Sequence, residues 1–315
     1  EIYTLSLHDA LPICQVSLLS ICDIKDDVKH ILELASKIKA GEIEKNPLEG
    51  KTLAMIFEKP STRTRVSFDV GMYQLGGRTL FLSSNDLQMG RGEPISDTAK
   101  VLSRFVDGIM IRAIEHDDVV ELAKYSDVPV ISGLTNLEHP CQVLADVLTI
   151  KEHFGSFDGK KICFVGDGNN VCNSLLLIAP ILGMNMSVTC PKGYEPNSQI
   201  IKKAQKLANK NNTEITVTDD VELALNNVDV VYTDVWVSMG DEIEFAQRKI
   251  DFKPYQVNSD LMKLANDDAI FMHCLPAIRG QEVSADVIDG PQSVVFDEAE
   301  NRLHAQKAVL YYYLK

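Results

Sequence analysis

The run Ser61-Thr62-Arg63-Thr64-Arg65 brings hydroxyl and guanidinium groups together at a point where a helix should begin. An apolar segment typical of a buried strand, 53–57, and then Pro60 precede it, and serine is a preferred helix-capping residue. Free N–H groups at a helix start favour an anion, and an adjacent arginine can bind a phosphate or carboxylate through two hydrogen bonds. We predict an anion site here. A capped, solvated helix start with surface arginines is the alternative.

The two arginines of this run cannot both face such an anion. Residues two positions apart on a helix point roughly 200° away from each other around its axis. Arg63 lies nearer the helix start than Arg65, so we expect Arg63 to make the contact.

Three further candidates lie in the first half of the chain. Arg112 ends the apolar segment 108–112, and His139 and Gln142 lie three residues apart around the start of a helix. Histidine can donate to an oxyanion, and glutamine can both donate and accept. Taken singly, an arginine at this position is more often a salt-bridge partner than a ligand, and the histidine–glutamine pair favours a structural role.

The second half repeats this pattern of an apolar segment followed by polar residues. Asn170, Asp234 and Cys274 each follow such a segment. The turn 166–170 contains Gly-x-Gly but lacks a third glycine, and no acidic residue ends the next strand, so a dinucleotide site is disfavoured.

Gln88, in the first half of the chain, lies in the polar, glycine-rich loop 83–94, which could carry function or be a simple surface excursion.

The elements that must position these residues alternate between strand-like and helix-like segments. The expected strands are 53–57, 79–82, 108–112, 128–132, 162–165, 186–189, 214–217, 228–232, 269–272 and 293–296. Helices are expected from Ser61 to the glycines at 76–77, where Val66, Val70 and Tyr73 recur at helical spacing, and at 24–40, 97–106, 140–153, 171–182, 198–210 and 298–313, with Arg302 near the start of the last.

This order predicts an α/β fold with two doubly wound parallel-sheet domains facing each other, joined by interdomain helices including the C-terminal helix. The carboxyl ends of parallel strands share one edge of their sheet, so the candidate polar residues should converge. That convergence, rather than any single motif, favours a functional site over the structural alternatives.

Composition limits the setting of such a site. A net charge of −14 disfavours nucleic acid or an anionic membrane as the main partner. The seven cysteines are scattered and form no C-x-x-C pair, which is typical of reduced thiols in the cytoplasm rather than of disulfides or a zinc site. Residues 1–13 match the in-frame translation of a common sequencing adapter, so we expect a non-native tail there.

Five motifs occur in order along the chain: S-T-R-T-R (61–65), H-P-C-Q (139–142), D-x-x-x-S-M-G (234–240), H-C-L-P (273–276) and D-E-A-E-N-R (297–302). Together they resemble the aspartate/ornithine carbamoyltransferase family, and the third and fourth resemble its ornithine-using branch. The resemblance covers the chain from about Ser17 onward. It implies a carbamoyl-phosphate-binding domain at 14–150, an ornithine-binding domain at 151–297, and a C-terminal helix, 298–315, that packs back on the first domain.

The resemblance also implies roles for individual residues. Carbamoyl phosphate would be bound by Ser61, Thr62, Arg63, Thr64, Gln88, Arg112, His139, Gln142, Cys274, Leu275 and Arg302. Ornithine would be bound by Asn170, Asp234, Ser238 and Met239. The residues closest to the chemistry would be Arg112, His139, Asp234 and Cys274.

The resemblance implies further that Gln88 enters the site of a neighbouring subunit, so that the active unit is a homotrimer or a multiple of it. No metal ion or organic cofactor would be needed. A carbamoyltransferase acting on another amine, putrescine or an ornithine derivative, or a non-catalytic binding protein on the same fold, remains open as an alternative. The H-C-L-P motif and the Ser-Met-Gly loop disfavour an aspartate-using relative. The presence of Ser238-Met239-Gly240 favours an amino-acid substrate over putrescine.

Overall fold

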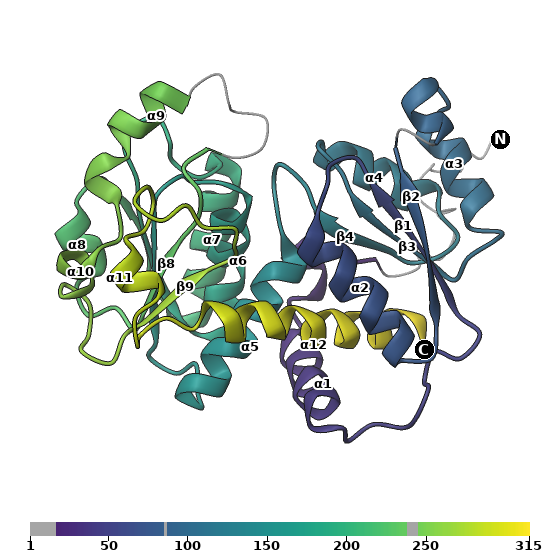
Figure 1. The fold of residues 1–315 in the computed structure, drawn as a ribbon, viewed down its shortest axis with the longest axis horizontal. Helices are drawn as coiled ribbons and strands as arrows, with labels where there is room; N and C mark the ends of the chain where they lie inside the picture. Colours follow the sequence, from purple (N-terminus) through teal and green to yellow (C-terminus); the bar gives the residue numbers. More distant parts are fainter. Residues whose placement is uncertain (1–16, 85–86, 238–244) are drawn as a thin grey trace, which may run out of the picture.

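The computed structural model describes residues 17–84, 87–237 and 245–315. The chain folds into two α/β lobes that lie side by side, and each lobe is built around its own parallel sheet (Figure 1). The predicted adapter-derived tail, 1–13, and the predicted ligands Ser238 and Met239 lie outside the described residues. No helix within the described ranges combines the length and apolar character needed to cross a bilayer.

The first lobe is built on a four-stranded parallel sheet in the order β2-β1-β3-β4. Its strands are β1 (Thr52–Phe57), β2 (Arg78–Ser83), β3 (Gly108–Arg112) and β4 (Val130–Leu134). Its helices and short turns are η1 (Ile21–Ile24), α1 (Val28–Ala40), α2 (Thr62–Gln74), η2 (Gln88–Arg91), α3 (Ile95–Leu102) and α4 (His116–Tyr125).

The two faces of this sheet pack on different helices, as the alternation of side chains along a strand requires. Leu53, Met55 and Phe57 of β1 belong to a core shared with α1, α2, α5 and α12. Ala54 and Ile56 of the same strand pack with α3 and α4 on the opposite face. Every residue of β1 is buried, which is why its sequence is a continuous apolar run rather than an alternating one.

The second lobe is built on a five-stranded parallel sheet in the order β7-β6-β5-β8-β9. Its strands are β5 (Lys161–Val165), β6 (Asn185–Thr189), β7 (Ile215–Thr218), β8 (Val230–Thr233) and β9 (Ile270–His273). Its helices are α6 (Asn170–Leu182), α7 (Ser198–Asn211), α8 (Val221–Leu225), α9 (Phe245–Asp251), η4 (Lys253–Tyr255), α10 (Ser259–Met262) and α11 (Ala285–Ile288).

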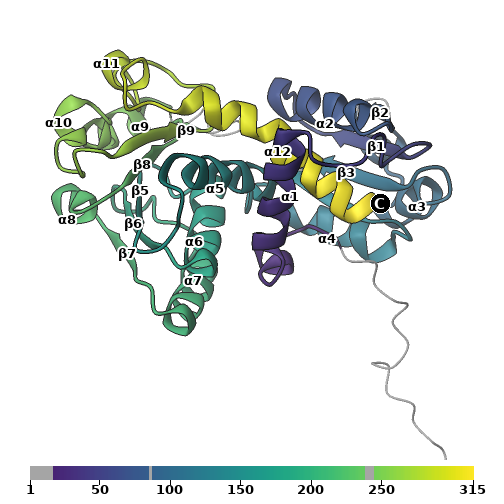
Figure 2. The ribbon, with the colours of Figure 1, turned by 90° about the horizontal axis from the view of Figure 1, so that it is seen from below.

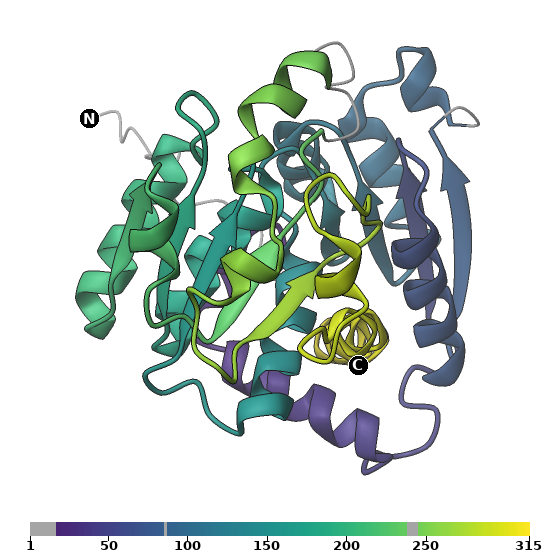
Figure 3. The ribbon, with the colours of Figure 1, turned by 60° about the vertical axis from the view of Figure 1, so that its left-hand side comes forward.

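Two long helices join the lobes. They are α5 (Pro140–Phe154) and α12 (Val295–Leu314), which pack against each other (Figure 2). The C-terminal helix α12 also packs on α1 and α2, and Figure 3 views it nearly along its axis with α1 beneath it. One apolar core therefore continues from the first sheet, through these helices, to one face of the second sheet.

The predicted fold class is confirmed, but some elements differ locally from the prediction. The predicted strand 293–296 is wrong: Ser293 forms a single bridge to Phe271, and α12 begins at Val295. Because α12 begins earlier than predicted, Arg302 lies in its third turn rather than near its start. The predicted helix 24–40 begins only at Val28, and Ile24 instead ends the separate short turn η1, which the Ser20 side chain caps.

The apolar residues that predicted helix α2 do not form its buried face. Val66, Val70 and Tyr73 recur at helical spacing as predicted, but their exposed fractions are 52%, 36% and 80%. The buried face of α2 is formed instead by residues such as Phe68 and Met72. Helical periodicity identified the helix correctly, but it could not tell which face meets this chain's own core.

Candidate active site

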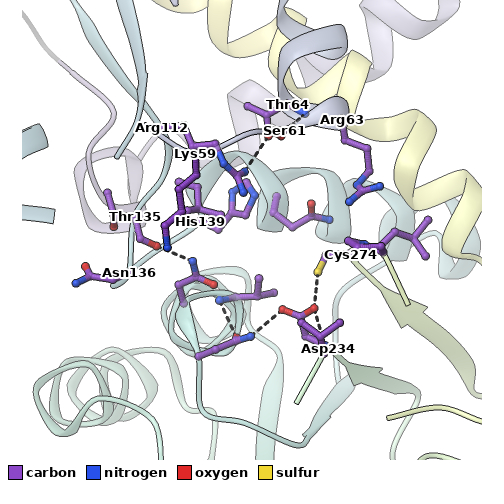
Figure 4. A pocket seen from close by; sticks show the side chains of 18 of the residues that line it. Lys59, Ser61, Arg63, Thr64, Arg112, Thr135, Asn136, His139, Asp234 and Cys274 are labelled. Carbon is purple, nitrogen blue, oxygen red and sulfur yellow. Dashed lines mark hydrogen bonds between the residues drawn. The ribbon is translucent and has the colours of Figure 1, made fainter. Parts of the chain in front are cut away.

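A cavity of about 820 Å³ opens between the lobes, at the carboxyl ends of the strands of both sheets. Figure 4 shows Arg63, Arg112 and His139 on one side of it and Asp234 and Cys274 on the other. Twelve of the residues predicted from sequence line this cavity: Ser61, Thr62, Arg63, Thr64, Arg112, His139, Gln142, Asn170, Asp234, Cys274, Leu275 and Arg302. The predicted convergence of polar residues from both halves of the chain is therefore observed.

The start of α2 forms one wall of the cavity. Ser61 caps the helix, and its side-chain oxygen accepts a hydrogen bond from Thr64 N at 3.3 Å. Arg63 lines the cavity, whereas the Arg65 guanidinium lies 3.7 Å from the ring centroid of Phe81, away from the cavity. The helical separation of the two arginines is thus observed as predicted.

Two buried arginines from distant parts of the chain meet beside this helix start. Thr64 Oγ1 accepts from Arg112 Nη1 at 3.4 Å and from Arg302 Nη2 at 3.1 Å. Arg302 Nη1 also donates to Gln142 Oε1 at 2.6 Å. Neither these arginines nor Arg63 form a salt bridge with a carboxylate in the part of the chain that the structure describes. The cavity wall therefore concentrates positive charge without a protein counter-ion.

This charge concentration changes the protonation behaviour of the groups in the wall. Burial, with Arg302 and Arg63 nearby, lowers the pKa of Arg112 to about 10. Burial and the same positive neighbours, together with Arg112, lower the pKa of His139 well below its usual value. At neutral pH His139 is therefore an uncharged imidazole beside three guanidinium groups.

Two buried donor or acceptor atoms in this wall lack a partner. They are Arg112 Nε and His139 Nδ1, and neither has a hydrogen bond among the described residues. Unpaired buried polar atoms are rare because each costs about 1–3 kcal/mol. A ligand carrying negative charge and several oxygen acceptors would satisfy Arg112 and compensate for the three guanidinium groups.

The opposite wall is acidic. Cys274 Sγ donates to Asp234 Oδ1 at 3.1 Å, and Asn169 Nδ2 donates to Asp234 Oδ2 at 2.7 Å. Burial, followed by the charge of Asp234, raises the pKa of Cys274 well above its usual value, so the sulfur is a thiol rather than a thiolate. A carboxylate oriented in this way can receive a cationic amine.

His273, at the end of β9, holds the loop that follows this strand, and its side chain does not line the cavity. His273 Nδ1 accepts from Leu275 N at 2.9 Å, and its Nε2 lies 3.3 Å from Glu282 Oε1. Leu275 has a left-handed φ of 56° and precedes a cis bond to Pro276. A left-handed φ at a residue that is not glycine persists where surrounding contacts fix it, commonly at functional sites. Asp234, His273 and Cys274 lie close enough to suggest metal ligands, but both ring nitrogens of His273 are already engaged.

Sequence reasoning missed several residues of the cavity. Asn169, which orients Asp234, was overlooked in favour of its neighbour Asn170, whose side chain donates to the Thr135 carbonyl at 2.6 Å. Asn169 also caps α6, and a capping asparagine at the end of 166–170 was the available signal. Lys59 and Asn136 also line the cavity. Gln88 is exposed on η2 and does not line it.

Comparisons with known proteins agree with this arrangement. Residues 17–152 match the family description "Aspartate/ornithine carbamoyltransferase, carbamoyl-P binding domain", and residues 158–313 match "Aspartate/ornithine carbamoyltransferase, Asp/Orn binding domain". A protein of Methanobrevibacter smithii named ornithine carbamoyltransferase is 78% identical over 299 residues, covering 95% of this chain and 99% of its own. One of Methanosphaera stadtmanae with the same name is 62% identical with the same coverage.

A solved structure agrees as well. The ornithine carbamoyltransferase from Pyrococcus furiosus superposes with a TM-score of 0.91 at 51% identity, covering 97% of this chain and 99% of that one. Both halves of the chain are matched by family descriptions, and the relatives extend over nearly its whole length. The chain therefore belongs to the aspartate/ornithine carbamoyltransferase family.

Proposed function

We propose that the protein transfers the carbamoyl group of carbamoyl phosphate to the δ-amine of L-ornithine, giving L-citrulline and phosphate. One observation carries this proposal: an uncompensated group of three arginines faces a carboxylate–thiol pair across a single cavity. The first wall suits a phosphate dianion, and the second suits the cationic amine of an amino acid. The relatives named ornithine carbamoyltransferase support the same reaction.

The cationic wall would bind carbamoyl phosphate. The start of α2 (Ser61 to Thr64) would hold the phosphate, with Arg112 between phosphate and carbonyl oxygen. Thr64, Arg112 and His139 would stabilise the oxyanion that forms on the carbonyl oxygen. Gln142 and Arg302, with the backbone of Cys274 and Leu275, would orient the carbamoyl NH₂ group.

The acidic wall would bind ornithine. Asp234, held by Asn169 and Cys274, would receive the δ-amine, while Asn170 and the predicted residues Ser238 and Met239 would bind the α-amino acid end. The thiol state of Cys274 favours a role as hydrogen-bond donor to Asp234 over a role as covalent nucleophile.

The reaction then needs little from the protein beyond positioning and charge. The unprotonated δ-amine attacks the carbonyl carbon, a C–N bond forms, and the C–O bond to phosphate breaks as the phosphate leaves with the bonding electrons. The proton that the amine loses passes to solvent or to the departing phosphate. Arginines that stabilise the oxyanion and the leaving phosphate supply most of the acceleration in such a transfer.

We further propose the two-domain division at residue 150 and a role in arginine biosynthesis in the cytoplasm. The six described cysteines are free, which supports a reducing compartment. A homotrimer or a multiple of it is proposed because the face around α2 and β2 is apolar and exposed, and because Gln88 does not line the cavity of its own chain.

The proposal is tested by incubating the chain lacking residues 1–13 with carbamoyl phosphate and each of L-ornithine, aspartate and putrescine. We expect a carbamoylated product, L-citrulline, with ornithine alone. Preference for another amine would contradict the assignment of the acidic wall and leave the phosphate wall intact. Absence of turnover in a folded oligomer would overturn the enzyme assignment in favour of a binding protein.

A further inference from the structure

A buried pair of carboxyl groups lies beneath the cavity, at the junction of the two lobes. Asp146 of α5 and Glu298 of α12 are both completely buried and lie within hydrogen-bonding reach of each other. Neither forms a salt bridge in the described part of the chain. Burying two carboxyl groups without a salt-bridge partner lowers stability, so their presence suggests a task that apolar residues could not perform.

Their common partner is Gln142, which lines the cavity. Gln142 Nε2 donates to Asp146 Oδ1 at 2.8 Å and to Glu298 Oε1 at 3.0 Å. Both N–H bonds of the amide therefore point at the carboxyl pair, and the amide oxygen points at Arg302. A glutamine amide is nearly symmetric in shape, so only its hydrogen-bond partners determine which end faces the cavity.

Glu298 also ties this arrangement to the second lobe. Its Oε1 accepts from the Tyr232 hydroxyl at 3.0 Å on β8, and its Oε2 accepts from His273 N at 2.9 Å on β9. Asp234 follows the end of β8, Cys274 follows the end of β9, and both residues line the cavity. One carboxyl group thus contacts the amide of the cationic wall and the strands that carry the acidic wall.

The hydrogen-bond pattern also locates a proton. Glu298 accepts from three donors, whereas Asp146 Oδ2 is buried without any donor. Two adjacent buried carboxylates cannot both remain charged, and burial raises the pKa of each. The charged or titratable groups around them are Arg302, Tyr232 and Cys274, of which only Arg302 is cationic. A proton on Asp146 Oδ2, donated to Glu298, satisfies the remaining oxygen.

We propose that Asp146 and Glu298, sharing one proton carried by Asp146, form a positioning unit that fixes the amide of Gln142 with its oxygen toward Arg302 and couples this orientation to β8 and β9. The inference rests on the proposed function for its kinetic measurement. It adds two residues that touch no substrate but determine the geometry of one that does.

Isosteric amide substitutions test the location of the proton. In Asp146→Asn, the new N–H₂ group replaces the shared proton and the oxygen still accepts from Gln142, so activity should largely remain. In Glu298→Gln, an N–H₂ group must face a donor, so kcat/KM should fall on the order of a hundredfold through misplacement of Gln142. The reverse order of effects, or equal tolerance of both, would overturn the proposal.

A double-mutant cycle tests whether the pair acts through Gln142. Asp146→Ala should lower kcat/KM in the parent chain but have little further effect in a Gln142→Ala background. Additive losses would contradict the proposal. Leu148→Ala, a buried change on the same helix, should lower the melting temperature without changing kcat/KM of the folded enzyme.

Binding of carbamoyl phosphate, measured by calorimetry, separates this inference from the proposed function. If the parent chain binds carbamoyl phosphate but does not carbamoylate ornithine, the proposed function fails, and the affinities of the same variants still report on the pair. Glu298→Gln should then bind more weakly than Asp146→Asn, and equal affinities would overturn the proposal.

Discussion

Arg63 and Arg65 have the same chemistry and lie two residues apart, yet only Arg63 lines the cavity. This makes them a matched pair for one substitution. Arg63→Lys keeps the charge but loses the planar fork that binds two phosphate oxygens, so kcat/KM for carbamoyl phosphate should fall about tenfold to a hundredfold. Arg65 stacks on Phe81 instead, so Arg65→Lys should have the kcat/KM of the parent. Equal losses in steady-state kinetics would show that the phosphate does not bind at the start of α2.

Cys274 invites assignment as a nucleophile, but its environment argues otherwise. Burial and Asp234 keep it a thiol that donates to a carboxylate. Cys274→Ser should raise KM for ornithine about tenfold, because one hydrogen bond that orients Asp234 changes length, and should leave carbamoyl phosphate binding intact. A carbamoylated cysteine trapped and detected by mass spectrometry would contradict this role.

His139 should make stability depend on pH. Its pKa is lowered in the folded state, so below the ordinary value near 6.5 the unfolded chain binds a proton that the folded chain does not. Stability should therefore fall as pH decreases through 6.5. Compared with His139→Asn, the parent should lose up to about 1.4 kcal/mol of unfolding free energy per pH unit between pH 6.5 and 5. Chemical denaturation of both proteins at several pH values measures this. A constant difference would mean that His139 binds protons equally in the folded and unfolded chain.

Elements were predicted best where a single physical signal dominates. Strand 108–112 was predicted with the bounds of β3, because a fully buried parallel strand is a short apolar run between polar residues. Segment 293–296 is also a short, mainly apolar run, but it leads into α12, which begins at Val295. Short apolar runs do not distinguish a strand from a buried helix start. A tertiary contact shows the outcome here: the bridge to Phe271 of β9 is limited to Ser293, and the helix begins two residues later.

Asn169 stabilises the start of α6 and also orients Asp234 in the cavity, and the two roles can be tested separately. Its side-chain oxygen accepts from Val171 N and Cys172 N at 3.0 and 3.1 Å, which caps α6, while its nitrogen donates to Asp234. Asn169→Ala should destabilise the protein by about 1 kcal/mol and raise KM for ornithine. Asn169→Ser should restore the stability, since serine caps a helix about as well, but not KM. Recovery of both in the serine variant would show that the contact with Asp234 is unimportant.

At the scale of the whole molecule, sequence located most of the cavity but not its supporting contacts. Strand ends could be aligned on one edge because parallel sheets require it, and this brought Arg112 and Asp234 into one prediction. The contacts of Asp146 and Glu298 could not be foreseen, since the residues are 152 positions apart on helices whose crossing is set by packing. Likewise, the sequence of one chain could not show which apolar residues of α2 face outward, because such residues can pack on another chain instead of on their own core.

That outward face bears on assembly. Val66, Val70 and Tyr73 are exposed on α2, and Leu80 and Phe81 are exposed on β2, the edge strand of its sheet, against which α2 packs. An apolar face of this kind next to an unpaired strand edge usually meets another chain. Tyr73→Glu should therefore dissociate the proposed oligomer and abolish activity together, as measured by light scattering and citrulline formation. An active monomer would contradict shared sites.

Hybrid oligomers test the sharing directly. Arg112→Ala removes a group from a subunit's own cavity, and Gln88→Ala removes the group that we propose to enter the neighbouring cavity. Each variant alone should be nearly inactive. After the two are mixed, dissociated and reassembled, some cavities combine an intact Arg112 with an intact Gln88 from the adjacent subunit, so activity should return. Mixed oligomers that form but stay inactive would contradict the shared site, and the exposed face of α2 would then explain assembly without catalysis.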